Sequence, residues 1–253
     1  MMVAVASWAW TYGYDYLARA WLGGPFRVHE DALNAWLEGV AQRDSDLSRH
    51  IAGIVRSLDD SGELESATRE FQDCIALPMP GLYVPPYASF WLDPSKSLWG
   101  AVTRQVLSWY NDAGLDWSNH VSPYPSVRAP DHLGIECAFA AELWAGVAGT
   151  SYAGGADSSD SLFAVDPVNP VGAVDPVGSS GAGDLVGSVE PTGSLENLRR
   201  VFIGEHMSAW VPLYAKELRN RLTSTYWRGM ADILQRWVHL NALELLPAAR
   251  ITS

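Results

Sequence analysis

The sequence predicts an all-α protein, an irregular helical bundle of two helical parts joined by a hinge that carries a long flexible acidic insertion. Apolar residues recur at helical spacing over most of the 253 residues, and the alternation typical of strands is almost absent. The stretch 149–195 lacks both patterns. We therefore expect an N-terminal helical part over 1–148, the insertion over 149–195 and a C-terminal helical part over 196–253.

The beginning of the chain is expected to form successive amphipathic helices. Residues 1–10 are apolar, but no Lys or Arg precedes Arg19, so the basic start of a secretory signal is missing and a first helix is the better interpretation. Apolar spacing predicts helices over Ser7–Leu22, Glu30–Gln42, Leu47–Leu58 and Leu64–Leu77.

The next segment, LPMPGLYVPPYASFWLD at 77–93, interrupts the helical pattern. Its prolines at 78, 80, 85 and 86 prevent a continuing helix and favour extended or turn backbone. Large apolar and aromatic residues lie between them. The segment is therefore either a buried strap or one wall of a groove.

Helical spacing returns after this loop. A helix is expected over Ser97–Ala113, and a second one carries Ile135, Phe139 and Leu143 at four-residue steps. The stripe of the first helix that should face the core consists of Leu98, Val102, Val106, Trp109 and Ala113.

The C-terminal part is again helical, with one interruption. Pro212 predicts that one helix ends near Ser208–Ala209 and that another begins with Pro212 at its first position. The last long helix is marked by apolar residues at helical spacing, namely Tyr226, Met230, Ile233, Trp237 and Leu240.

The insertion differs from the rest in composition. Gly, Ser and Pro supply nearly half of Gly149–Leu195, and AVDPV occurs at 164–168 and again at 173–177. It has six acidic residues and no Lys or Arg, so it carries half of the net charge of −12. Such a stretch buries too little apolar surface to order itself, and we expect a flexible connection.

Charge and composition exclude several classes of partner. A net charge of −12 argues against nucleic-acid binding and against docking on anionic lipid, and no apolar run approaches the roughly 18 residues of a membrane span. A basic partner such as an Arg-containing peptide is steered toward such a surface, although solubility alone also explains the charge. Cys74 and Cys137 stand far apart, which is typical of a reducing compartment without disulfides.

Catalytic motifs are missing. There is no G-x-S-x-G elbow, no H-E-x-x-H and no phosphate-binding loop. His132 and Glu136 stand at i and i+4 and could share a metal, but a third ligand is not evident, since Glu142 lies off that face and His206 is remote. Asp131 is expected to be a helix N-cap. A metal-dependent helical enzyme using His132 and Glu136 therefore remains the alternative.

Several segments together resemble the TorD/DmsD family of redox-enzyme maturation chaperones. They agree in order and spacing from about Phe71 to Trp237, although the insertion is longer than the family's short hinge and the first ~60 residues match only as helices. The segments are PPYASFWLD at 85–93, LWG at 98–100, APDHLGIECAFAAELW at 129–144, EHMSAWVPLYAKEL at 205–218 and Tyr226–Trp227.

The resemblance implies a cytoplasmic assembly chaperone that catalyses nothing and needs no cofactor. It would bind the twin-arginine signal peptide and the folded body of a molybdoenzyme precursor, holding it until cofactor insertion and before export, as a monomer or a domain-swapped homodimer. A non-catalytic adaptor without affinity for signal peptides is the other alternative. Carried over by motif, the peptide-binding positions are Pro86, Tyr87, Ser89, Trp91, Asp131 and His132, together with Phe71 and Ile75.

In the predicted binding mode, the Pro85–Trp91 loop and the start of the helix at Asp131–His132 lie side by side. Tyr87 stacks on the apolar part of the peptide. Asp131 faces a guanidinium, and His132 orients it or hydrogen-bonds to peptide backbone.

Overall fold

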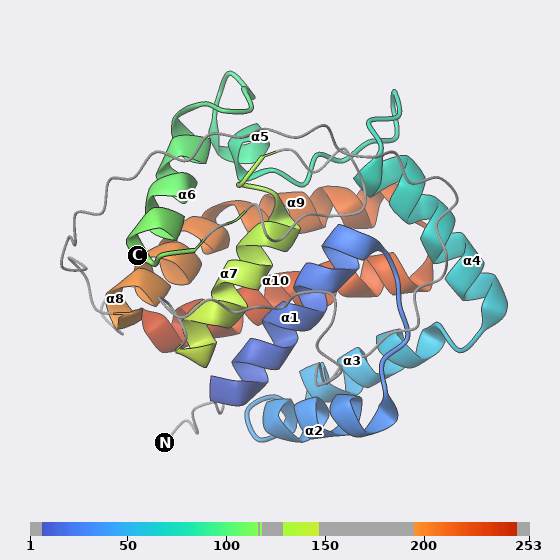
Figure 1. Cartoon of the computed structure of the whole chain (residues 1–253). Helices are drawn as coiled ribbons and strands as arrows, with labels where there is room; N and C mark the ends of the chain where they lie inside the picture. The colour runs from blue at the N-terminus through green and yellow to red at the C-terminus, as the bar shows by residue number, and fades with distance from the viewer. Residues whose placement is uncertain (1–6, 116, 118–128, 147–194, 247–253) are drawn as a thin grey trace, which may run out of the picture.

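The computed structural model describes residues 7–115, 117, 129–146 and 195–246, and every regular element in these ranges is helical (Figure 1). An isolated bridge between Tyr87 and His132 is the strand-like feature within them. The predicted all-α class is confirmed. The predicted insertion, apart from Leu195, lies outside the described residues.

The centre of the molecule is built from α1 (Ser7–Gly23), α7 (Leu133–Ala145) and α10 (Thr225–Leu245). Helix α1 packs along α7, and α10 runs behind both (Figure 1). Gly13 makes the close approach of α10 possible, because a Cβ there would lie 2.2 Å from Cζ2 of Trp237. Buried apolar residues of both predicted parts form one continuous core.

Helices α2 (Glu30–Ala41), α3 (Ser45–Ser57) and α4 (Ser61–Glu70) follow α1 close to their predicted places. The side chains of Asp44 and Asp60 cap α3 and α4 by accepting hydrogen bonds from backbone N–H groups of the first turn. Capping fixes where each helix begins, and the amphipathic faces then pack α2 on α3 and α3 on α10.

The N-terminus of α10 is fixed by an acid from another helix. The Glu70 carboxylate, at the end of α4, accepts hydrogen bonds from the backbone and hydroxyl groups of Thr223 and Ser224, the latter being the N-cap of α10. Burial opposes ionisation of this carboxyl, but the hydrogen bonds outweigh it and lower the pKa of Glu70. The contact joins segments about 150 positions apart in the chain.

Within the described ranges, two segments are wound as π-helix. Helix α4 continues into η1 (Phe71–Ala76), and α8 (Leu195–Arg199) continues through η3 (Arg200–Met207) into α9 (Ser208–Arg221). The wider π turn changes the register of the backbone hydrogen bonds.

The predicted helix break at Pro212 is wrong. Pro212 lies inside α9, five residues after η3 ends. Proline cannot donate to the carbonyl four residues before it, which here is that of Ser208, the first residue of α9. The change from π to α winding at this point accommodates the missing bond, so the helix continues.

The Pro-rich loop also departs from the prediction, because it contains a short helix, α5 (Ala88–Leu92). Helix α6 (Ala101–Asp112) begins four residues later than predicted, since residues 97–100 form a turn. Leu98, which was assigned to the core-facing stripe, is 45% exposed in that turn. No helix among the described residues is both long and apolar enough to cross a membrane.

Candidate functional site

Asp131 joins the segments that the sequence singled out. It is completely buried. Its Oδ2 accepts a hydrogen bond from the backbone N–H of Ser89 at 2.8 Å, and its Oδ1 accepts one from Oγ1 of Thr103 at 3.2 Å. Its backbone carbonyl also accepts from the N–H of Ala88. Asp131 therefore caps α5 and ties that helix to α6.

The N-cap of α7 is His132, so the prediction that Asp131 caps its own helix is wrong. Nδ1 of His132 accepts a hydrogen bond from the N–H of Gly134 at 3.1 Å. An acceptor at Nδ1 requires a neutral ring whose proton is on Nε2, and burial lowers the pKa of His132 from 6.5 to about 3. The imidazole is therefore neutral at physiological pH.

Tyr87 lies directly against His132. The two residues form the isolated antiparallel bridge, and their rings meet edge to face with centroids 5.2 Å apart. The N–H of Leu133 donates to the carbonyl of Pro86 at 2.8 Å, which extends the pairing by one step. The predicted neighbourhood of the Pro85–Trp91 loop and the Asp131–His132 helix start is present in the structure.

The other predicted residues have different surroundings. Trp91 is half-buried, donates from Nε1 to the carbonyl of Pro85 at 2.9 Å, and places its ring against Tyr214. Phe71 and Ile75 lie in η1 and are buried in the core, where Phe71 stacks on Trp227. The structure thus gathers Pro86, Tyr87, Ser89, Asp131 and His132, and assigns Phe71 and Ile75 to packing.

One polar atom within this cluster is left without a partner. The hydroxyl of Ser89 is buried and makes no hydrogen bond with any described residue. Buried polar groups are nearly always paired, so an unpaired one in a predicted site calls for an explanation.

The exposed apolar surface close to this cluster was missed by the sequence reasoning. Five of the seven large apolar side chains that are exposed in the described ranges belong to two loops, 77–83 and 93–100. Both loops project from the same end of the molecule, with α5 between them (Figure 1). The signal was in the sequence, since both loops flank the Pro-aromatic motif, but helical spacing assigned Leu98 to the core. The exposed residues are Leu77, Met79, Leu82, Leu98 and Trp99.

The buried carboxyl group of Glu136 does not pair with His132. It accepts hydrogen bonds from Nε2 of His206 at 2.8 Å and from Nε1 of Trp210 at 3.1 Å. Burial raises the pKa of Glu136, against the opposing effect of His206. The prediction that His206 is remote is therefore wrong. Within the described residues no group of three or more His, Cys, Asp or Glu could hold a metal, so the geometry gives the metal-enzyme alternative no support.

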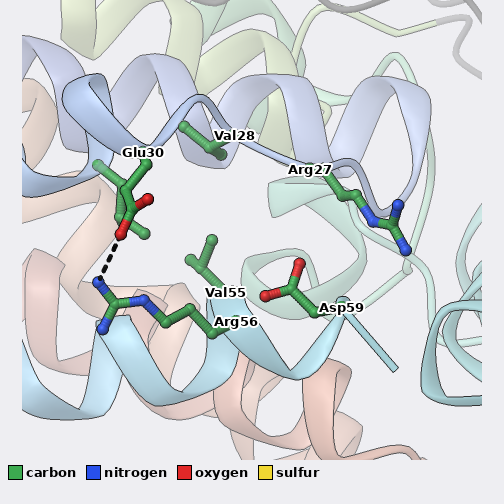
Figure 2. Close-up of a pocket in the computed structure, with 7 residues that line it drawn as sticks. Arg27, Val28, Glu30, Val55, Arg56 and Asp59 are labelled. Atoms are coloured by element: carbon green, nitrogen blue, oxygen red, sulfur yellow. Dashed lines mark ion pairs between the residues drawn. The ribbon is translucent and has the colours of Figure 1, made fainter. Parts of the chain in front are cut away.

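A recess of about 190 Å³ lies away from this cluster, between the segment after α1 and helix α3 (Figure 2). Three of its polar side chains are already engaged. Arg56 pairs with Glu30 at 3.9 Å, and Arg27 donates to the carbonyl of Leu58 at 3.2 Å. None of the predicted site residues lines it.

Comparison with known proteins gives one match. A family model described as nitrate reductase delta subunit matches residues 34–161, just over half of the chain. The matched range contains both segments that meet at Asp131. No curated protein and no solved structure matches the chain.

Proposed function

The chain belongs to the nitrate reductase delta subunit family, whose members are chaperones of molybdoenzyme maturation rather than enzymes, and from this premise we propose that it binds the signal peptide of a molybdoenzyme precursor. The membership confirms the resemblance to redox-enzyme maturation chaperones that the motifs predicted. The proposed client is a molybdenum-cofactor oxidoreductase subunit with a twin-arginine signal. The chaperone binds its signal and its folded body in the cytoplasm, and holds it until the cofactor is inserted and before export.

The observation that supports this proposal best is the meeting of two distant segments at one buried residue. Residues 86–89 and 131–132 are more than 40 positions apart, yet Asp131 hydrogen-bonds to the first turn of α5 and His132 packs on Tyr87. A loop fixed in this way is preorganised, which reduces the conformational cost of binding a peptide. The hydroxyl of Ser89, which is as fully buried as Asp131, belongs to this fixed framework and does not meet the peptide.

The arrangement changes the role proposed for Asp131. Its side chain has no exposed surface, and both of its oxygens already accept hydrogen bonds. We therefore propose that Asp131 shapes the site from beneath instead of receiving a guanidinium. Attraction of a basic peptide then comes from the acidic surface as a whole, because the net charge is −12.

Calorimetric titration tests the proposal. The purified chain is titrated with a synthetic peptide carrying the twin-arginine segment of a molybdoenzyme catalytic subunit encoded in the same genome. Wild-type protein is expected to bind it, and Tyr87→Ala to bind at least about tenfold more weakly, because the buried ring that fixes the loop against His132 is lost and the site is no longer preorganised. Melting curves for each variant separate loss of binding from loss of fold.

Two controls sharpen the result. Trp8→Ala removes an exposed Trp from the start of α1 and should leave the affinity unchanged. A peptide whose arginines are replaced by glutamine should bind more weakly. Absence of binding by the wild-type chain would contradict the proposal and favour a non-catalytic adaptor.

Both a monomer and a domain-swapped homodimer are compatible with the proposed function.

A further inference from the structure

The turn before α6 has an unusual backbone. Lys96 and Trp99 are the two non-glycine residues with positive φ in the described ranges, at 52° and 66°. This left-handed conformation is unfavourable for residues with a Cβ, and a bulky aromatic rarely adopts it. Such strain persists only where surrounding contacts enforce it, and it is found mostly at functional positions.

The contact that enforces this turn leads to Asp131. Thr103, a buried residue of α6, accepts a hydrogen bond at Oγ1 from the N–H of Trp99 at 3.1 Å. The same hydroxyl donates to Oδ1 of Asp131. The carbonyl of Trp99 also accepts from the guanidinium of Arg104 at 3.3 Å. The strained residue is therefore connected through one hydroxyl to the group that also holds α5.

The turn presents apolar surface beside an acid. Leu98 is 45% and Trp99 51% exposed. Asp93 lies at the other end of the turn, where hydrogen bonds from the hydroxyl and N–H of Ser95 lower its pKa and keep it ionised. The ammonium group of Lys96 lies over the ring of Phe90, 4.5 Å from its centroid. Asp93, which was not among the predicted site residues, is thus an acid beside the site that solvent reaches, whereas Asp131 is completely buried.

We propose that the 93–100 turn is the part of the site that touches the signal peptide. Leu98 and Trp99 pack against the apolar stretch of the peptide, Asp93 receives an arginine, and Thr103 is a positioning residue that keeps Trp99 in its strained conformation. This inference rests on the proposed function and names the contacts of the same site. The occupant is a basic, apolar peptide because the turn exposes two large apolar side chains beside Asp93, while its exposed cation, Lys96, is drawn over the Phe90 ring and the whole chain carries a net charge of −12.

Removal of the Trp99 side chain tests the contact. In calorimetry with the same synthetic peptide, Trp99→Ala is expected to weaken binding at least about tenfold, while Trp8→Ala, a matched loss of an exposed Trp, leaves it unchanged. If Trp99→Ala binds like wild type while Tyr87→Ala binds poorly, this inference is overturned and the proposed function stands. If wild type does not bind, both fail.

The acid is tested by pairing a variant with a changed peptide. Asp93→Asn should bind the natural peptide several-fold more weakly, yet bind the glutamine-substituted peptide as wild type does. An equal loss of affinity for both peptides would show that Asp93 acts on the fold and not on an arginine, and would overturn its assignment.

The test of Thr103 must distinguish positioning of Trp99 from a general effect on the fold. Thr103→Val keeps the shape but removes both hydrogen bonds, and Thr103→Ser retains the hydroxyl. Binding is expected to fall with Val and to recover with Ser. In a Trp99→Ala background, Thr103→Val should cause no further loss, because its effect passes through Trp99. An additive loss in the double variant would overturn the positioning role.

Discussion

At the scale of single residues, the site depends on hydrogen-bond partners that are distant in sequence. Asp131 carries a carboxylate that could bind a ligand, and it stands just before a helix that it could cap. The structure shows that His132, not Asp131, caps α7 and that Asp131 is buried. Its partners are Ser89 and Thr103, 42 and 28 positions away. Its side chain therefore contributes by holding two other segments in place.

This role predicts opposite outcomes for two substitutions of Asp131. Asp131→Asn can still accept from Ser89 N–H and can donate its amide to Thr103, so peptide affinity should stay within about threefold of wild type, or ~0.7 kcal/mol. Asp131→Ala leaves buried donors unpaired and should lower the free energy of unfolding by about 2 kcal/mol or more. Calorimetry and urea unfolding measure the two effects. A tenfold loss of binding in a stable Asp131→Asn variant would instead mean that the carboxylate itself meets the peptide.

The neutral ring of His132 predicts a dependence of stability on pH. Its pKa is about 3 in the folded chain and near 6.5 when unfolded, so the unfolded state binds more protons between these values. Stability is fully present above pH 6.5 and falls by up to roughly 1.4 kcal/mol for each pH unit below it. Unfolding free energies measured from pH 7 to pH 5 should show this slope. His132→Asn retains a capping acceptor but does not titrate. Its free energy of unfolding should therefore depend less steeply on pH, by the contribution of one bound proton.

The strained turn predicts a difference between two truncations of Trp99. Both Trp99→Ala and Trp99→Gly remove the indole, but only Gly adopts positive φ without strain. The free energy of unfolding should therefore be higher for Trp99→Gly than for Trp99→Ala. The expected difference is about 0.5–1 kcal/mol after allowing for the extra entropy of Gly in the unfolded chain. Equal stability of the two variants would mean that the turn relaxes when the ring is removed.

At the scale of elements, the long helices could be predicted from the sequence because their apolar faces repeat at a regular spacing. Helices α1, α2, α7 and α10 appear close to their expected places. Pro212 was misjudged because π winding before it is invisible to a pattern built on 3.6 residues per turn. Leu98 fits the stripe of α6 by spacing, yet a hydrogen bond to Thr103 holds its neighbour in a turn.

The candidate site was predicted as a set of residues but not as a surface. Motifs correctly brought the Pro85–Trp91 loop next to Asp131–His132. The motifs did not show that Asp131 is buried while Asp93 is accessible. The packing of α5 and α6 against the loops determines which side chains face solvent, and a motif does not encode that packing. Thr103 has no sequence signal of its own, since a threonine within a helical stretch is ordinary.

The cap that Glu70 of α4 provides for α10 predicts a large effect from a single half-buried side chain. Glu70→Ala removes the acceptor for groups of Thr223 and Ser224 and should lower the free energy of unfolding by about 2 kcal/mol. The control is Glu65→Ala in the same helix, where only an exposed ion pair with Arg69 is lost and about 0.5 kcal/mol or less is expected. Similar losses for both in urea unfolding would contradict the capping role.

At the scale of the whole molecule, the described residues on either side of the insertion lie close together. Nε of Arg199 donates to the carbonyl of Leu143 at 2.8 Å, and its guanidinium lies over the ring of Trp144. The C-terminal end of α7 therefore lies beside α8. A long connection is not required to join them.

Shortening of the insertion is accordingly expected to preserve the fold. Replacing residues 149–193 with about eight Gly and Ser residues spans the gap, because such a chain reaches roughly 15 Å. The melting temperature should change by no more than ~4 °C, which corresponds to about 1 kcal/mol at this size. A fall of about 10 °C or more in a thermal melt would mean that the insertion packs on the bundle.

Helix α1 binds partners that are synthesised much later. Tyr14 donates to Asn241, 227 positions away, and Tyr16 and Trp21 hydrogen-bond to Tyr226 and Tyr214. On the ribosome, at about 5–20 residues per second, α1 waits roughly 10–45 s for α10. Such non-local contacts slow folding. Helix α1 thus lacks these partners while the intervening residues are synthesised, and the chaperone becomes competent to protect a client only after α10 has been made.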